Sequence, residues 1–225
     1  MVNNEMSGNV SLDIYFDYLW PYVYNAAVWL QRVQASVGEG LNVNWKYFSL
    51  EQVNNQENPQ WKIWEQPETY PSRGLHAFWA AEASRHQGEV AFSSFHFALL
   101  SAKHEEHRDI ANTNTLIQVA ESVGLEITQF QQDISNHQLL TKLTEDHTFA
   151  IETLGIWGTP TLVFPKKQVI FLKMTQPPSP EESLSVFTEL RHLTERRRYI
   201  QEIKRPQHPS TWQLAYKPNI LYPYS

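Results

Sequence analysis

The order of the predicted secondary structure indicates an α/β protein that carries a large, all-helical insertion. Two strand patterns separated by a helical pattern occupy the first fifty residues or so, and two strand patterns followed by a helix lead to residue 200. Between them, residues 53–154 carry helical periodicity and no convincing strand. Because a strand–helix–strand crossover joins parallel strands, we expect a helix-covered sheet with a helical domain inserted between its two halves.

The first fifty residues contain the expected crossover. Apolar side chains alternate over residues 12–16 and again over 41–47, which is the pattern of half-buried strands. Pro21 suits the first turn of the helix between them, where its missing N–H costs nothing, and Gly38 is its expected stop. The apolar stripe of that helix is formed by Tyr22, Ala26, Trp29, Val33 and Val37.

Helical stripes continue from Arg73 to Gly155, the expected end of the last helix in the insertion. Thr128 and Gln131 have the spacing of a capping box, so we expect a helix to begin there. Residues 161–164 and 169–172 form a predicted hairpin, and Ser179 then caps a final helix. We expect the core fold in residues 10–52 and 155–200, the helical domain in 53–154 and a C-terminal tail in 201–225. Residues 196–198, three arginines at the end of the final helix, are read as a solvated helix terminus.

Composition excludes several classes of function. The net charge of −6 and the pI near 5.8 argue against a nucleic-acid partner. No run approaches the roughly 18 apolar residues of a membrane span, and we expect no membrane partner. The first residues lack the basic and apolar regions of a signal peptide, so we expect a cytoplasmic protein. The chain has no cysteine, which excludes disulfide exchange and thiolate catalysis by its own side chains.

Two motifs and the insertion between them resemble the DsbA family of thioredoxin-fold proteins, in its FrnE-like branch. Residues 16–24 are similar to the segment in which Cys-Pro-x-Cys opens the first helix of that bacterial-type family. Residues 155–161, Gly-Ile-Trp-Gly-Thr-Pro-Thr, resemble its cis-proline loop, and residues 73–105 resemble its helical domain. The resemblance implies a thioredoxin-like fold of βαβ…ββα order, a cis bond before Pro160 and an oxidoreductase ancestry.

The chain departs from that family where the chemistry occurs. Trp20 and Val23 stand at the positions of the two cysteines, so thiol–disulfide chemistry is not inherited, even though the family's oxidoreductase label can follow from homology. We therefore interpret the protein as a binding module for a peptide or a small aromatic ligand. The expected groove consists of Trp20, Pro21, Tyr22, Val23, Trp157, Thr159 and Pro160. Trp20 and Trp157 either form an aromatic wall of this groove or fill the site and close it. A purely structural role, with the helical insertion as a partner surface, is a further alternative.

The same residues resemble a second group, the 2-hydroxychromene-2-carboxylate isomerases and kappa-class glutathione transferases. Pro21, Tyr22 and Tyr24 match the Ser-Pro-Tyr-x-Tyr pattern of these enzymes, but Trp20 replaces the serine that holds the glutathione thiolate. This resemblance implies a glutathione-dependent isomerase or transferase as the alternative function. Glutathione would then supply the sulfur that the chain lacks.

Four side chains are candidates for catalysis: Tyr22, Tyr24, Asp17 and His147. Asp17 and His147 also have a structural interpretation. An aspartate at the start of a helix commonly accepts backbone N–H bonds, and a histidine on an apolar helix stripe is commonly a buried, hydrogen-bonded one. His104 and His107, with His96 upstream, have the spacing of a partial metal site, but no third ligand is evident and we predict no metal.

Overall fold

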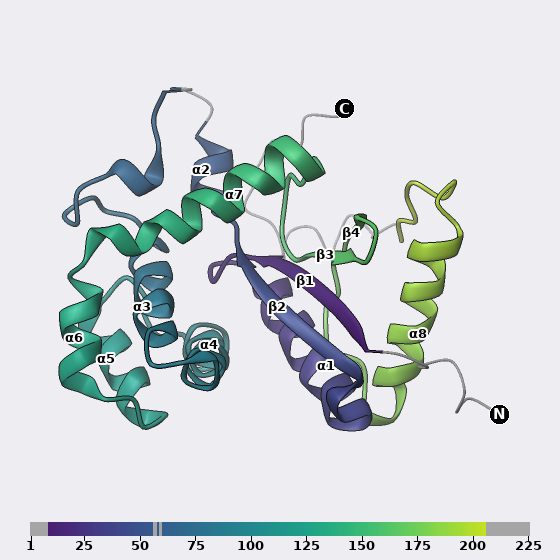
Figure 1. The fold of residues 1–225 in the computed structure, drawn as a ribbon, viewed down its shortest axis with the longest axis horizontal. Coiled ribbons are helices and arrows are strands. Elements are labelled where there is room, and N and C mark those ends of the chain that lie inside the picture. The colour runs from purple at the N-terminus through teal and green to yellow at the C-terminus, as the bar shows by residue number, and fades with distance from the viewer. Residues whose placement is uncertain (1–8, 56–57, 59, 206–225) are drawn as a thin grey trace, which may run out of the picture.

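A computed structural model describes residues 9–55, 58 and 60–205 of the chain, so most of the expected tail lies outside the described residues. Its centre is a four-stranded sheet with the order β2-β1-β3-β4 (Figure 1). The strands are β1 (Val10–Phe16), β2 (Leu41–Tyr47), β3 (Thr161–Phe164) and β4 (Gln168–Phe171). All four lie where the alternation of apolar residues predicts them, to within two residues.

Strand register brings two loops that are distant in sequence to the same end of the two central strands. β1 and β2 are parallel along their whole length, as the crossover predicts, whereas β3 runs antiparallel to β1 and to β4. Tyr15 in β1 pairs with Thr161 in β3. The chain that leaves β1 after Phe16 therefore lies beside the chain that enters β3 at Pro160.

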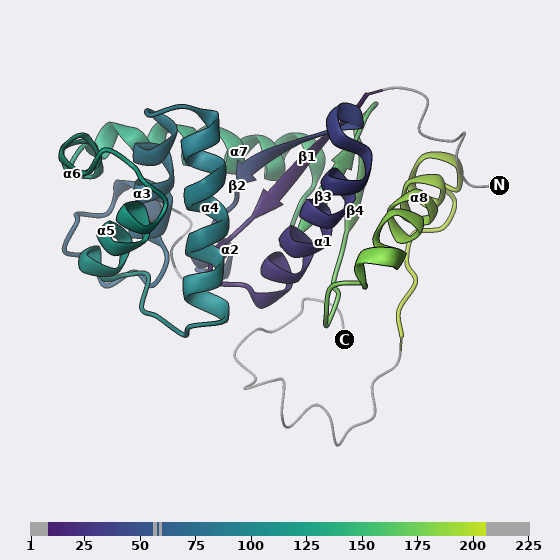
Figure 2. The same cartoon turned by 90° about the horizontal axis from the view of Figure 1, so that it is seen from below.

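Alternating side chains of the central strands pack against helices on opposite faces. Ile14 and Leu162 belong to the main core, which also contains buried residues of α1 (Pro21–Val37) and α8 (Pro180–Arg196). Tyr15 and Val163, on the other face, pack with Ala150 of α7 (Thr141–Leu154). α1 and α7 consequently enclose the sheet between them (Figure 2).

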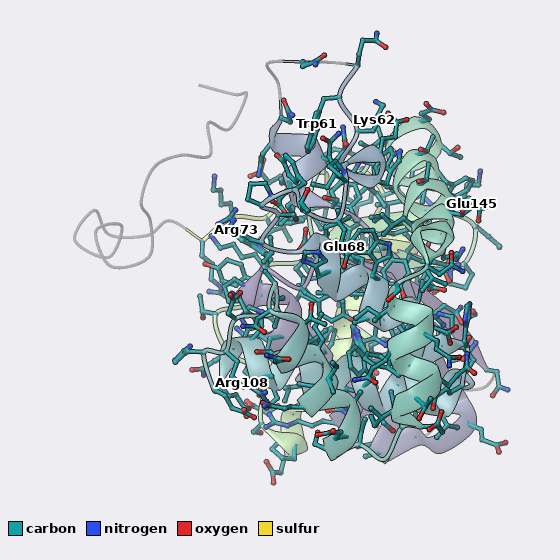
Figure 3. The ribbon with its side chains drawn as sticks, turned by 90° about the vertical axis from the view of Figure 1, so that its left-hand side faces the viewer. Trp61, Lys62, Glu68, Arg73, Arg108 and Glu145 are labelled. Atoms are coloured by element: carbon teal, nitrogen blue, oxygen red, sulfur yellow. The ribbon has the colours of Figure 1, made fainter. Side chains whose placement is uncertain are left out.

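In its described part, the insertion contains helices joined by turns and irregular segments, and no strand. It contains α2 (Leu50–Asn54), α3 (Leu75–Arg85), α4 (Glu89–His104), α5 (Thr113–Ser122) and α6 (Ile127–Ile134), followed by α7. Short 3₁₀ turns occupy Gly38–Gly40, Ile63–Glu65 and His137–Leu140. Figure 3 shows the molecule from the side on which the insertion lies, with Arg73 on the segment that leads into α3. In the described residues, no helix is long and apolar enough to cross a bilayer.

Local capping chemistry fixes the helix ends, and one expected cap is wrong. Ser179 accepts the N–H of Glu182 at 3.3 Å, and Gly155 ends α7 with a left-handed φ of 66°, as predicted. The helix expected to start at Thr128 instead begins one residue earlier. The carboxylate of Glu126 caps it by accepting the N–H groups of Thr128 and Gln129. A carboxylate is a strong acceptor for these free N–H groups, so Glu126 takes the capping role.

Candidate functional site

The first turn of α1 begins at the end of the sheet where the central strand β1 stops. Trp20 occupies the N-cap position but makes no side-chain capping bond, and Pro21 follows at the first helical position. The turn contains no acidic residue, while the N–H of Val23 bonds to the carbonyl of Trp20 at 3.0 Å. The partial positive charge at this helix start is therefore not balanced by a side chain of its own turn.

The proline loop before β3 contributes the second half of the site. The Thr159–Pro160 peptide bond is cis, and both residues are buried. Trp157 is 56% exposed, and its ring packs on Phe171 with a centroid separation of 4.6 Å. The hydroxyl of Thr159 is buried and finds no hydrogen-bond partner among the described residues. This loop thus presents one exposed indole beside a buried polar group.

The chain that follows β4 links the two halves. The N–H of Leu172 donates to the carbonyl of Pro160 at 3.0 Å. One residue later, the ammonium of Lys173 lies 4.6 Å from the centroid of the Tyr22 ring. Through these two contacts, the proline loop and the first turn of α1 are held on either side of one short segment.

We call the surface formed by Trp20, Tyr22, Trp157, Phe171 and Lys173 the aromatic patch. Trp20 and Tyr22 contact each other nearly edge to face, with ring centroids 5.4 Å apart. Phe171 and Lys173 were not among the residues predicted for the site. The hairpin pattern places Phe171 in a strand, but only the fold shows that Lys173, just after this strand, contacts α1. The patch offers aromatic faces and one cation, and it contains no thiol.

Asp17 lies beneath the start of α1 and is almost fully buried. Its carboxylate accepts the N–H of Leu19 at 2.8 Å and that of Leu50 at 2.7 Å. Burial raises the pKa of Asp17 to about 6, although these two hydrogen bonds act in the opposite direction. Asp17 therefore joins the loop before α1 to the start of α2, which corresponds to the structural interpretation of this residue.

Tyr24 points away from the aromatic patch. Its hydroxyl donates to Glu105, and its ring stacks on His104 at 5.9 Å between centroids. Burial and the nearby Glu105 carboxylate raise the pKa of Tyr24 to about 12. Tyr24 thus contributes to the contact between α1 and the end of α4, and Tyr22 is the tyrosine that lies in the patch.

His147 lies on the α7 side of the sheet. Its Nδ1 accepts the N–H of Ser49 at 3.1 Å, so the ring carries its proton on Nε2. Burial lowers the pKa of His147 to about 4, which keeps the ring neutral near pH 7. The ring contacts Phe48 and Trp64 at centroid distances of 4.7 and 5.3 Å. The structure therefore places His147 among aromatic side chains of another region rather than in the patch.

Comparison with known proteins identifies the family. Residues 11–176 match the model of the DSBA-like thioredoxin domain. The chain belongs to the DSBA-like thioredoxin domain family. This match agrees with the predicted thioredoxin-like fold, and it spans both loops of the aromatic patch.

Solved structures share the DSBA-like fold at low sequence identity. The thiol-disulfide exchange protein α-DsbA2 from Wolbachia pipientis has a TM-score of 0.57 and 15% identity, covering 83% of this chain and 82% of its own. A 2-hydroxychromene-2-carboxylate isomerase has a TM-score of 0.57 and 16% identity, covering 85% and 100%. The cytosolic disulfide reductase DsbM from Pseudomonas aeruginosa, solved with GSH, has a TM-score of 0.55 and 17% identity, covering 80% and 99%.

A sequence relative matches only a short part of the chain. The uncharacterized protein Rv2286c of Mycobacterium tuberculosis is 41% identical over 44 residues. That stretch is 20% of this chain and 18% of the relative, so the chain spans less than a fifth of the length of that protein. It adds no activity to the family assignment.

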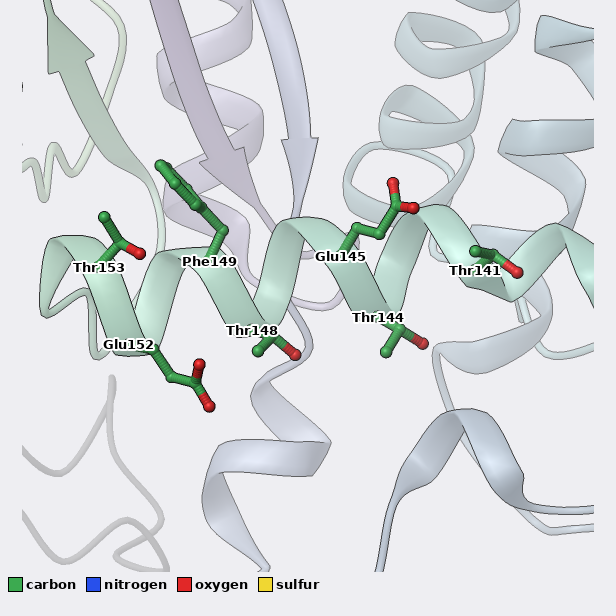
Figure 4. A pocket seen from close by; sticks show the side chains of 7 residues that line it. All are labelled: Thr141, Thr144, Glu145, Thr148, Phe149, Glu152 and Thr153. Atoms are coloured by element: carbon green, nitrogen blue, oxygen red, sulfur yellow. The ribbon is translucent and has the colours of Figure 1, made fainter.

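Two surface depressions lie away from the first turn of α1 and the proline loop. One, of about 550 Å³, runs along the outer face of α7, where threonine, glutamate and phenylalanine side chains project (Figure 4). The other, of about 330 Å³, lies between α7 and the β3–β4 turn and shares Phe149 with the first. No residue of the aromatic patch lines either depression.

Two of the three histidines considered as metal ligands, His96 and His104, have other partners in this DSBA-like fold. Nε2 of His104 lies 2.9 Å from the carbonyl of Tyr18, and Nδ1 of His96 lies 3.0 Å from the Tyr18 hydroxyl. Within residues 9–55, 58 and 60–205, no three His, Asp or Glu side chains are grouped to hold a metal ion. His96 and His104 therefore connect α4 to the segment between β1 and α1.

Proposed function

We propose that this protein is a ligand-binding member of the DSBA-like family that performs no thiol–disulfide exchange with its own residues. The observation that carries the proposal is the aromatic patch, in which Trp20 stands at the family's first cysteine position and which extends to the exposed Trp157. Its ligand is an extended peptide or a planar aromatic molecule.

The chemistry of the patch supports this class of ligand. Indole and phenol rings provide large apolar contact areas with little loss of side-chain freedom, which suits aromatic or peptide ligands. Lys173 adds a positive charge next to Tyr22, and the uncapped start of α1 adds a partial one. A ligand that carries a carboxylate beside an aromatic or extended portion would satisfy both features.

Selection of peptides from a phage-displayed library tests the proposal. Peptides enriched on the wild-type protein are synthesised, and their affinity is measured by calorimetry for wild type, Trp20→Ala and Trp157→Ala. Each substitution should weaken binding about tenfold or more if the indole is an anchor of the interface. Val90→Ser is the matched control, because Val90 is 83% exposed at the start of α4. Equal affinity for all four proteins would place the binding site elsewhere.

A glutathione-dependent isomerase or transferase is the second candidate, and the position of Tyr22 favours it. Tyr22 matches the residue pattern of these enzymes and lies in the patch, whereas the hydroxyl of Tyr24 is bonded to Glu105. The fold of the solved 2-hydroxychromene-2-carboxylate isomerase is shared by this chain. Glutathione brings its own thiol and two carboxylates, and Lys173 with the start of α1 could hold one of these carboxylates.

Thermal denaturation in the presence of reduced glutathione distinguishes the two candidates. A ligand that binds the folded state raises the melting temperature by mass action, so a bound tripeptide at millimolar concentration should give a measurable increase. The increase should shrink in Tyr22→Phe and Lys173→Ala, with Tyr24→Phe as the control. An unchanged melting temperature would remove the enzyme from consideration while leaving the peptide selection unaffected.

The cytoplasmic location expected from the sequence remains a proposal. A chain without cysteine has no disulfide to maintain, so an oxidising compartment offers it no stabilisation. Fractionation of cells that produce the tagged protein, followed by immunoblotting, tests this location.

A further inference from the structure

Charge is distributed very unevenly along the sequence. Residues 196–225 contain six Lys or Arg and one Glu, whereas residues 1–195 contain twelve Lys or Arg and 23 Asp or Glu. An acidic chain thus carries a basic segment after residue 195. A local excess of positive charge on an otherwise negative chain is a typical signature of a tail that meets an anionic surface.

The described part of this segment keeps its positive charges exposed. We call residues 196–205 the basic strip; its exposed cations are Arg196, Arg197, Arg198, Lys204 and Arg205. Among the described residues, none of these five side chains takes part in an ion pair. Arg191, one turn earlier in α8, differs because it pairs with Glu195 at 3.1 Å. The cationic side chains of the strip are therefore available to a partner.

Exposed apolar side chains lie between these charges. Tyr199 is 78% exposed, Ile203 is 70% exposed and Ile200 is 39% exposed. The N–H of Ile200 bonds to the carbonyl of Arg197 at 2.9 Å, which forms a turn immediately after α8. The strip lies at the end of the molecule opposite α5 and α6, where no other labelled element covers it (Figure 1).

We propose that the basic strip docks this protein onto the surface of an anionic lipid bilayer. Guanidinium groups bind lipid phosphates strongly, and tyrosine and isoleucine side chains enter the boundary between head groups and acyl chains. The acidic body would be repelled, so only the strip would face the bilayer. The expectation of no membrane partner rested on the missing apolar span, and the absence of a span does not bear on such peripheral binding.

Other kinds of partner fit the strip less well. Three exposed apolar side chains are far fewer than the roughly 20 residues that each side of a stable protein interface contributes. Isoleucine side chains do not stack on bases, so a single-stranded nucleic acid would use only Tyr199 and the charges. A lipid surface places no demand on the spacing of the cations, because its head groups diffuse to meet them.

Vesicle co-sedimentation of the full chain tests the proposal. Wild type should bind vesicles of phosphatidylcholine with about 30% phosphatidylglycerol, and binding should fall as salt rises, because the charges are exposed. Replacing Arg196, Arg197 and Arg198 together by Gln should lower the partition coefficient at least about tenfold, since each basic residue contributes roughly a factor of five. Lys166→Gln with Lys167→Gln is the control, because it removes two exposed positive charges elsewhere on the surface, and it should bind as wild type does.

Three outcomes would overturn the proposal. They are equal binding to pure phosphatidylcholine, unchanged binding of the triple variant, and tighter binding to a single-stranded RNA that the triple variant loses. The apolar contribution is tested by Tyr199→Ser with Ile203→Ser, which should also weaken vesicle binding. Val90→Ser serves as its exposed control, and equal binding of both would contradict the insertion of these side chains.

Discussion

The hydroxyl of Tyr18 lies 3.0 Å from Nδ1 of His96, and both side chains are completely buried. The two residues are 78 positions apart in the sequence, one just after β1 and the other in the middle of α4. The other ring nitrogen of His96 has no partner among the described residues. Together with the contact between His104 and the Tyr18 carbonyl, this hydrogen bond joins the segment that leads into the site to the helical insertion. The rings of Phe16, Trp45 and Phe92 surround His96.

Removal of the Tyr18 hydroxyl should destabilise the protein. Tyr18→Phe leaves both nitrogens of His96 without a partner in the core, and we expect a loss of about 1–3 kcal/mol in the free energy of unfolding. Tyr24→Phe is the matched control, because its hydroxyl bonds to the exposed Glu105, and it should cost less than about 1 kcal/mol. Urea denaturation at pH 7 measures both. Equal losses would contradict the buried Tyr18–His96 bond.

The buried histidines should make the protein lose stability in mild acid. Burial lowers the pKa of His96 to about 3 and that of His147 to about 4, whereas the unfolded chain titrates near pH 6.5. Between these values the unfolded chain binds protons that the folded chain does not, so the free energy of unfolding falls as pH drops from 6.5 towards 4. Each histidine contributes a slope of about 1.4 kcal/mol per pH unit.

His147→Asn isolates one of these contributions. Its free energy of unfolding, measured by urea denaturation from pH 4.5 to 7.5, should depend on pH less steeply than that of wild type below pH 6.5, by about 1.4 kcal/mol per unit. Curves that run parallel over this range would show that His147 titrates normally in the folded state.

Asp17 should act in the opposite direction over nearly the same range. Its pKa rises from 3.8 to about 6 on folding, so between pH 4 and 6 the folded chain holds a proton that the unfolded chain has released. The contribution of Asp17 to stability therefore declines as pH rises through this window.

Asp17→Asn removes that decline, although it loses an acceptor for one backbone N–H at every pH. The difference in stability between variant and wild type should become more favourable to the variant by up to about 3 kcal/mol from pH 4 to 7. A difference that is constant with pH would contradict the raised pKa.

Restoring the two thiols tests whether the loss of cysteine is the only barrier to the family's chemistry. Wild type should not accelerate the reduction of insulin by dithiothreitol, since it has no cysteine. Trp20→Cys with Val23→Cys places one thiol at the uncapped start of α1, where the helix dipole lowers a thiol pKa, and the other in a buried position. We expect this double variant to accelerate insulin precipitation. Trp20→Ala with Val23→Ala is the control, and equal rates for the two would show that the site has diverged beyond its thiols.

The sequence predicts most of the fold because strand and helix patterns are local. Alternation in residues 12–16 follows directly from the two faces of β1, since Ile14 packs towards α1 and Tyr15 towards α7. Helix geometry likewise separates the two tyrosines of the motif. Tyr24 lies two residues after Tyr22, about 200° around the helix, and so it faces α4 rather than the patch.

The site was predictable only in part, because its remaining residues meet through the fold. The resemblance to a family brings Trp20 and Trp157 together, but no motif includes Lys173, which reaches Tyr22 only because β4 lies beyond β3 in the sheet. Similarly, the Leu50 N–H that binds Asp17 lies 33 residues away in sequence. Contacts of this kind depend on strand order and helix placement, which apolar periodicity does not specify.

Gly74, at the entrance to α3, lies against the side chain of Leu19. A β-carbon at this position would be 3.1 Å from two atoms of Leu19, closer than ordinary carbon contacts. The N–H of Gly74 also donates to Glu51 of α2 at 3.1 Å, so the backbone there has little room to retreat. An added methyl group would therefore require the side chain of Leu19, in the loop that carries Trp20, to shift by a few tenths of an ångström. Because Gly74 has no side chain, the segment that enters α3 can pack directly against Leu19 in the loop before α1, although the two segments are more than 50 residues apart in the sequence.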